Sequence, residues 1–119
     1  MSVTYRVLHE GKPLELDVVF ARGFWARTWG WLGRHSLKPN DALWIEPCAR
    51  VHTLGMRVAI SIVMLNPDGY VIALQDRISP WNVGPMGVFR GVALELAPGA
   101  VSRFGIRLGD RLTLKGSSR

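Results

Sequence analysis

One tight-turn sequence between two apolar runs constrains this chain more than any other feature. Asn66-Pro67-Asp68-Gly69 separates the run Val58–Leu65 from the run Tyr70–Gln75. Proline presets the backbone for a turn, and Gly69 can adopt positive φ. The first run is almost continuously apolar, which is typical of a central strand that is covered on both faces. The sequence therefore predicts an antiparallel hairpin at the centre of the fold.

Other short segments show the two-residue periodicity of strands. Val3–His9 and Leu14–Phe20 alternate between apolar and polar residues around a turn at Glu10–Pro13, which predicts a second hairpin. Further short strands are expected over residues 42–46, 88–96 and 111–115, with residues 116–119 frayed. Short strands joined by turns, without alternating long helices, predict a mainly β fold: a compact antiparallel sandwich or small barrel with one or two short helices.

Helical spacing occurs at two places in the chain. In segment 24–34, which contains three tryptophans, a stripe of Phe24, Trp25, Thr28, Trp29 and Leu32 recurs at intervals typical of a helix, and Gly33 is placed to end it. We expect these tryptophans to pack under the sheet rather than to form an exposed stacking platform. A helical turn is expected after Ala97-Pro98-Gly99, ending at Gly105.

Composition limits the classes of protein that fit. The 119 residues are enough for a single domain over residues 1–119, and 48% of them are hydrophobic, so disorder is not expected. One cysteine allows no internal disulfide, and no segment is typical of a signal peptide or a membrane span. We therefore expect a cytoplasmic protein. The oligomeric state is left open by the sequence.

The net charge of +6 comes mostly from arginines that are spread along the chain. Such a distribution gives weak, salt-sensitive attraction to polyanions. Because no run of like charges forms a nucleic-acid-binding arm, nucleic acid is a less favoured partner, although it is not excluded.

The segment Cys48–Arg57 has the least expected composition, because it gathers a thiol, an imidazole, a thioether and two guanidinium groups. Cys48 and His52, with Met56 as a soft third ligand, are weak candidates for metal binding, since a metal site needs three or four ligands. The same Cys48 and His52 could form a nucleophile pair only if a turn brought them together. The alternative is an inert buried cysteine. No cofactor is predicted.

Glu95 is the one acidic residue in the mostly apolar strand predicted over 88–96. Because it shares a face with Ala93, we expect it to point to solvent. If it points inward, it needs a cation, and an arginine is the expected partner.

Several motifs, taken in order, resemble one known family. Segment 27–34 (RTWGWLGR), the segment Val51–Arg57 with the run and turn that follow it, Leu94–Gly99 and Ile106–Leu112 are similar to motifs of the domain of unknown function 192 family of bacteria and archaea. The resemblance implies a compact β-rich domain and no established activity. The chain departs from the family pattern at several positions: Trp31, His52, Thr53, Ala59 and Ser61 replace its methionine, aromatic pair, proline and aspartate.

The favoured hypothesis is a small binding or accessory domain without catalytic activity, which recognises an unidentified ligand or protein. Its binding surface would combine polar and soft side chains in the loops beside the central strands, where sites often lie. The candidates are Arg34, His52, Thr53, Met56, Arg57 and Trp81. A Cys/His-dependent enzyme or metal-binding protein, and a weak binder of nucleic acid or another polyanion, are the alternatives.

Overall fold

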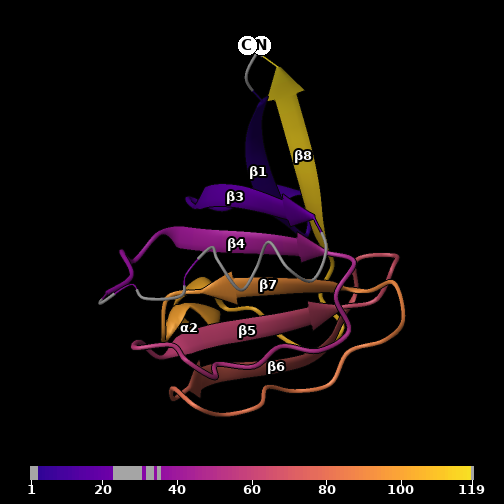
Figure 1. The fold of residues 1–119 in the computed structure, drawn as a ribbon. Coiled ribbons are helices and arrows are strands. Elements are labelled where there is room, and N and C mark those ends of the chain that lie inside the picture. Colours follow the sequence, from indigo (N-terminus) through magenta and orange to yellow (C-terminus); the bar gives the residue numbers. More distant parts are fainter. Residues whose placement is uncertain (1–2, 23–30, 32–33, 35, 119) are drawn as a thin grey trace.

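The computed structural model describes residues 3–22, 31, 34 and 36–118. Its elements are nearly all strands, as the sequence predicts (Figure 1). The strands are β1 (Val3–His9), β2 (Lys12–Pro13), β3 (Asp17–Arg22), β4 (Asp41–Glu46), β5 (Ile60–Leu65), β6 (Val71–Ile78), β7 (Val92–Leu96) and β8 (Leu112–Ser118), and the described helix is α2 (Ala100–Phe104).

The strands form one strongly curled sheet in the order β2-β1-β3-β4-β7-β5-β6, with β8 paired to the other edge of β1. Neighbouring strands are antiparallel except for β3 and β4, which run parallel. A bridge between Tyr70 and Arg111 joins the start of β6 to the residue before β8. The backbone N–H of Leu112 donates to Gly69 O at 2.9 Å in the same place. The sheet is therefore a half-barrel whose two ends touch.

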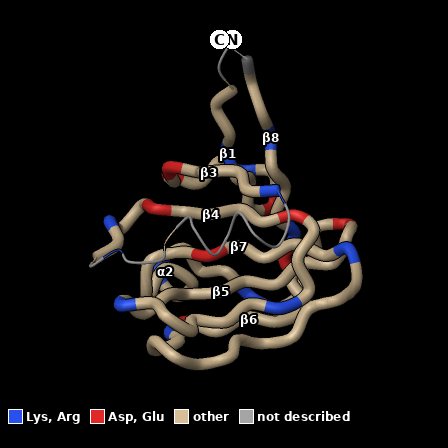
Figure 2. Tube along the Cα trace, viewed as in Figure 1, with Lys and Arg blue, Asp and Glu red and all other residues tan. Residues whose placement is uncertain are grey.

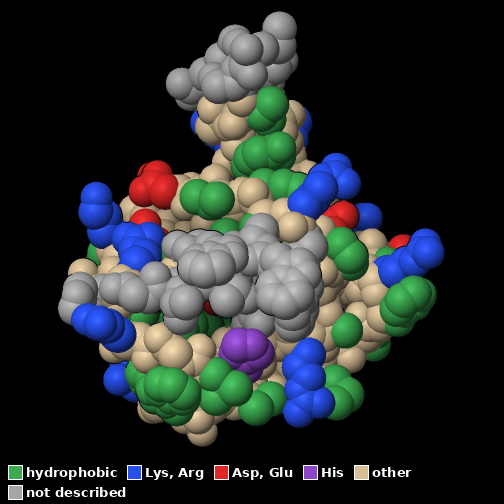
Figure 3. Space-filling model, in the orientation of Figure 1, with side chains coloured by type: hydrophobic (Ala, Val, Ile, Leu, Met, Phe, Trp, Pro, Cys, Tyr) green, Lys and Arg blue, Asp and Glu red, His purple; other side chains and the backbone are tan. Residues whose placement is uncertain are grey.

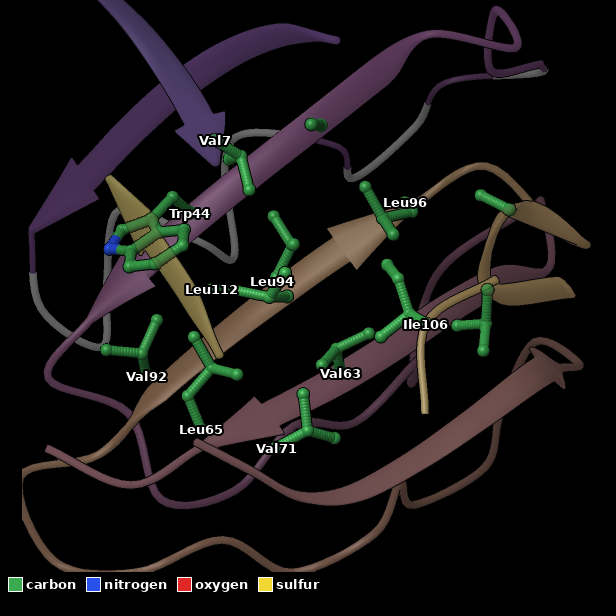
Figure 4. Packing of buried hydrophobic residues seen from close by; sticks show 13 residues of the cluster. Val7, Trp44, Val63, Leu65, Val71, Val92, Leu94, Leu96, Ile106 and Leu112 are labelled. Atoms are coloured by element: carbon green, nitrogen blue, oxygen red, sulfur yellow. The ribbon is translucent and has the colours of Figure 1, made fainter. Parts of the chain in front are cut away.

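The concave side of the half-barrel holds the larger of two apolar clusters (Figure 4). Trp44, Val63 and Leu94 point into it from three neighbouring strands, and β8 contributes the fully buried Leu112. Helix α2 covers one end of this cluster with Ala100 and Val101. Along β4, β5 and β7, the residues of this cluster alternate with residues whose side chains point to the convex face.

The convex face of β4, β7 and β5 carries the second cluster. Leu43, Ile62 and Ala93 lie on it, and residues from the loop after β4, including Val51 and Met56, pack over them. Both faces of the central strands are therefore covered. This explains why β5 is buried at all six positions and is apolar at every position except Ser61.

The central hairpin is confirmed, because β5 and β6 pair antiparallel across the turn at 66–69. The helical turn near residue 100 and its end at Gly105 are confirmed as well, and Gly105 is left-handed there. Trp31 is buried and packs against the convex-face cluster. The rest of the helix predicted over 24–34 lies outside the described residues, apart from Arg34.

One expectation about the chain ends is wrong, and the hairpin predicted near the N-terminus is confirmed only in part. Residues 116–118 are not frayed but complete β8, which pairs with β1 from Val3↔Ser118 to His9↔Leu112. β1 takes β8 as its main partner, and it meets β3 only at Tyr5↔Val18. Local alternation identifies a strand but not its partner, so pairing across the whole length of the chain could not be predicted from these segments.

No helix in the described part of the chain is long and apolar enough to cross a bilayer.

Candidate binding surface

Two loops run side by side over the convex face, and we call residues 47–59 and 79–91 together the twin loops. Backbone hydrogen bonds connect them along their length: Cys48 N to Gly91 O, Gly87 N to Ala49 O, Gly84 N to Val51 O and Thr53 N to Asn82 O, each at 2.8 Å. An antiparallel bridge pairs His52 with Val83. The twin loops are therefore fixed to each other by backbone hydrogen bonds, and we call the pair a braced platform.

Thr53 is the central connection between the two loops, and its side chain is fully buried. Its hydroxyl donates to Ser79 O at 2.7 Å and accepts from the backbone N–H of Asn82 at 2.9 Å. Its carbonyl accepts from the backbone N–H of Trp81 at 2.9 Å. Thr53 therefore fixes the backbone around Trp81.

Large apolar side chains project from the twin loops. Their exposed fractions reach 81% for Phe89, 70% for Trp81 and 64% for Met86, values that no packed core residue has. The exposed apolar residues of the twin loops are Leu54, Trp81, Val83, Met86, Val88 and Phe89. Exposed apolar groups concentrated in one region are typical of an interaction site.

Backbone strain occurs at two positions of the twin loops. Trp81 has φ of 65° and Arg90 has φ of 59°, in the left-handed region that bulky residues seldom adopt. A non-glycine residue costs about 1–2 kcal/mol there. Such strain is concentrated at functional sites, because the surrounding structure must hold it in place.

The charge of the twin loops has one sign. Residues 47–59 and 79–91 contain three exposed arginines, Arg50, Arg57 and Arg90, and no aspartate or glutamate. The lower part of Figure 3 shows hydrophobic and Lys/Arg side chains interspersed on this side of the molecule. Lys and Arg elsewhere are dispersed among acidic residues along the chain (Figure 2). The guanidinium of Arg90 lies 5.3 Å from the centre of the Phe89 ring, so charge and apolar surface adjoin.

The structure divides the candidate residues of the sequence into three groups. His52, Arg57 and Trp81 lie on the twin loops, where Trp81 and Arg57 are exposed and His52 is half-buried. Thr53 and Met56 belong to the same loops but are buried, and Met56 packs in the convex-face cluster. Arg34 lies outside the twin loops, and its guanidinium contacts the Asp41 carboxylate at 3.2 Å.

The remaining candidates concern metal and thiol chemistry. Cys48 is buried, and its thiol lies 3.2 Å from Arg50 O as a hydrogen-bond donor. The ring nitrogen Nδ1 of His52 accepts from the backbone N–H of Leu54 at 3.3 Å. Among the residues that the structure describes, no three His, Cys, Asp or Glu side chains gather closely enough to hold a metal ion.

Glu95 does not point to solvent, contrary to the expectation from the sequence. Its side chain is 1% exposed on the convex face of β7, between Leu43 on β4 and Ile62 on β5. The prediction failed because it took the face shared with Ala93 for a solvent face, whereas the twin loops and Trp31 contribute to a cluster on that face.

Sequence reasoning missed Met86 and Phe89. The sequence predicts a strand over 88–96 that includes residue 89, but β7 begins only at Val92. The sequence does contain one signal for this surface, which is the scarcity of acidic residues. Between Glu46 and Glu95 the only acidic residues are Asp68 and Asp76, and neither lies in the twin loops.

Comparison with known proteins agrees with the motifs. The family model DUF192, described as "Uncharacterized ACR", matches residues 6–114. The chain belongs to the DUF192 family. No curated protein matches it in sequence. The description of DUF192 assigns no activity.

Two crystal structures share the fold of this DUF192 member. One is a protein of unknown function from Novosphingobium aromaticivorans, with a TM-score of 0.77 and 17% identity over 92% of this chain and 83% of that one. The other, from Sinorhizobium meliloti, is described as a "putative transcription regulator" and has a TM-score of 0.73 and 19% identity over 94% of this chain and 93% of that one. Identities this low support the fold alone.

Proposed function

We propose that this chain is a binding module without catalytic activity, whose binding surface is formed by the twin loops. The observation that carries the proposal is the combination, on two braced loops, of projecting apolar side chains with arginines and no acidic residue. The partner is accordingly negatively charged and also presents apolar groups. The module extends over residues 1–119, and its single cysteine fits a reducing, cytoplasmic location.

The contacts within the loops support binding rather than chemistry. Thr53, a candidate from the sequence, uses its hydroxyl within the platform. The buried Cys48 thiol, bonded to a backbone carbonyl, has the environment of a structural cysteine. His52, Arg57 and Trp81 are the candidate residues that would meet the partner.

Removal of charge from the twin loops tests the proposal. The combined substitution of Arg50, Arg57 and Arg90 by glutamine is expected to weaken binding to labelled heparin, a soluble polyanion. The dependence of log K on log salt should become shallower by about one per arginine that contacts the polyanion. The measurement is a fluorescence titration at several salt concentrations.

The matched control removes the same charge elsewhere, at the exposed residues Arg6, Lys38 and Arg107. Equal losses in the two triple variants would show that heparin responds only to net charge, and the proposal would then be wrong. Circular dichroism of both variants checks that the fold is retained.

A further inference from the structure

The kind of partner can be specified further, given that the proposed binding surface is correct. We propose that the twin loops dock on an anionic lipid bilayer, with Trp81, Met86 and Phe89 entering the interfacial region and the arginines contacting lipid phosphates. Charge complementarity supports this occupant, because the loops carry three arginines and no acidic residue.

The exposed apolar groups suit acyl chains better than nucleic-acid bases. Four of the six are aliphatic or thioether side chains, namely Leu54, Val83, Met86 and Val88, which offer no ring for a base to stack on. Indole rings are enriched at the membrane–water interface, and Phe occurs with Trp and Leu among the groups that interfacial segments bury in the bilayer. The Arg90 guanidinium lies over the Phe89 ring. It therefore occupies one of the two ring faces on which a base would stack.

The twin loops carry one side-chain amide, that of Asn82, and it is already bonded within its own loop. The side-chain amide of Asn82 donates to Ser79 O at 3.1 Å and to Pro80 O at 3.0 Å, so both of its donors serve the loop itself. A bilayer requires no such donors, because it is recognised by charge and apolar insertion.

Backbone geometry holds the inserting side chains outward. Trp81 keeps its left-handed conformation because its N–H is bonded to Thr53 O and the next N–H to the Thr53 hydroxyl. A preorganised anchor loses less conformational freedom on binding.

The test uses co-sedimentation with vesicles of phosphatidylcholine and phosphatidylglycerol, compared with phosphatidylcholine alone. The intact chain is expected to bind the mixed vesicles more tightly. Combined Trp81→Asn and Phe89→Ala substitutions should weaken this binding by about tenfold or more, because the rings no longer leave water. Asparagine tolerates the left-handed backbone, so the loop keeps its shape.

The control variant combines Val19→Ala and Leu108→Ala, which remove exposed apolar groups outside the twin loops. Its affinity should stay within about twofold of the original, as surface changes away from a site usually do little. Insertion is checked independently by brominated acyl chains, which should quench the fluorescence of the intact chain more than that of the Trp81→Phe variant.

Three outcomes would overturn the inference: no binding to the mixed vesicles, equal losses in the two double variants, or a single-stranded oligonucleotide that displaces the vesicles and binds through Trp81 and Phe89. If the chain does not bind the mixed vesicles but the variant without Arg50, Arg57 and Arg90 still loses more heparin affinity than its control, only the inference about the bilayer is wrong. If the two triple variants lose heparin affinity equally, the proposed function itself is wrong.

Discussion

Thr53 shows how a single polar residue organises a surface that it does not reach. It was selected from the sequence as a binding candidate, and its hydroxyl instead connects the twin loops from a fully buried position. Its place between two strands was predictable. Its burial was not, because burial depends on residues 79–82, which approach from the other loop.

Replacement of Thr53 by valine should lower the free energy of unfolding by about 1–3 kcal/mol, because two part-buried hydrogen bonds of its hydroxyl are lost: the Asn82 N–H loses its acceptor, and the Ser79 carbonyl loses one of its donors. The measurement is urea unfolding followed by circular dichroism. Thr53→Ser keeps the hydroxyl and should cost less. A valine variant as stable as the original would contradict the central role of this hydroxyl.

Asp76 connects β6 to helix α2 and to the neighbouring strand β5. The backbone N–H of Ser102 donates to its Oδ1 at 3.1 Å, and the Ser102 hydroxyl donates to Oδ2. The Ser61 hydroxyl donates to the Asp76 carbonyl. The hydrogen bond from the Ser102 side chain is the main cause that lowers the pKa of Asp76 below 3.8, with Ser61 adding to it.

Stability should therefore depend on pH through Asp76. Because its pKa is lower in the folded state than the unfolded value of 3.8, its stabilising contribution is present above about pH 4. The contribution is lost as pH falls through the folded-state pKa. Asp76→Asn should thus destabilise the protein at neutral pH, and the difference should shrink in acid. Thermal unfolding from pH 7 to pH 2 measures it, with Asp17→Asn at an exposed position as the control.

At the scale of elements, the central hairpin was the most predictable unit and also takes part in closing the half-barrel. The turn residues that define it in the sequence place Gly69 against the start of β8, where its carbonyl accepts from Leu112 N–H. A Cβ atom at Gly69 would lie 2.6 Å from the backbone oxygen of Leu112. The turn glycine is therefore required for two reasons, its φ of 93° and this close approach.

Gly69→Ala is consequently expected to cost more stability than backbone strain alone. Gly11 provides the control, because its φ of 80° is similar but a Cβ there would meet no atom within 4 Å. Gly11→Ala should cost about 1–2 kcal/mol, and Gly69→Ala about 1–3 kcal/mol more, as for an overpacked site. Equal free energies of unfolding for the two variants would show that the contact with β8 relaxes without cost.

At the scale of the whole molecule, the sequence predicted the class of fold but not how the strands are assembled. Alternation and turn residues identified the β segments, since these signals are local. The parallel pairing of β3 with β4 and the pairing of β1 with β8 join segments that no local signal connects. The candidate site could be predicted only in part, because composition is a local signal and the pairing of the two loops is not. Residues 48–57 were recognised by composition, whereas Met86 and Phe89 join them only through the ladder between the loops.

The register of β1 with β8 has a mechanical consequence. Val3 lies opposite Ser118, so the two ends of the described chain leave the molecule at the same place (Figure 1). A pulling force applied to these ends would separate the two strands pair by pair from Val3 towards His9, because antiparallel hydrogen bonds lie across the strands. The rest of the sheet would bear little load until that ribbon had opened. Tension between the ends would therefore first release β8, and with it the bridge at Arg111 that joins the two ends of the half-barrel.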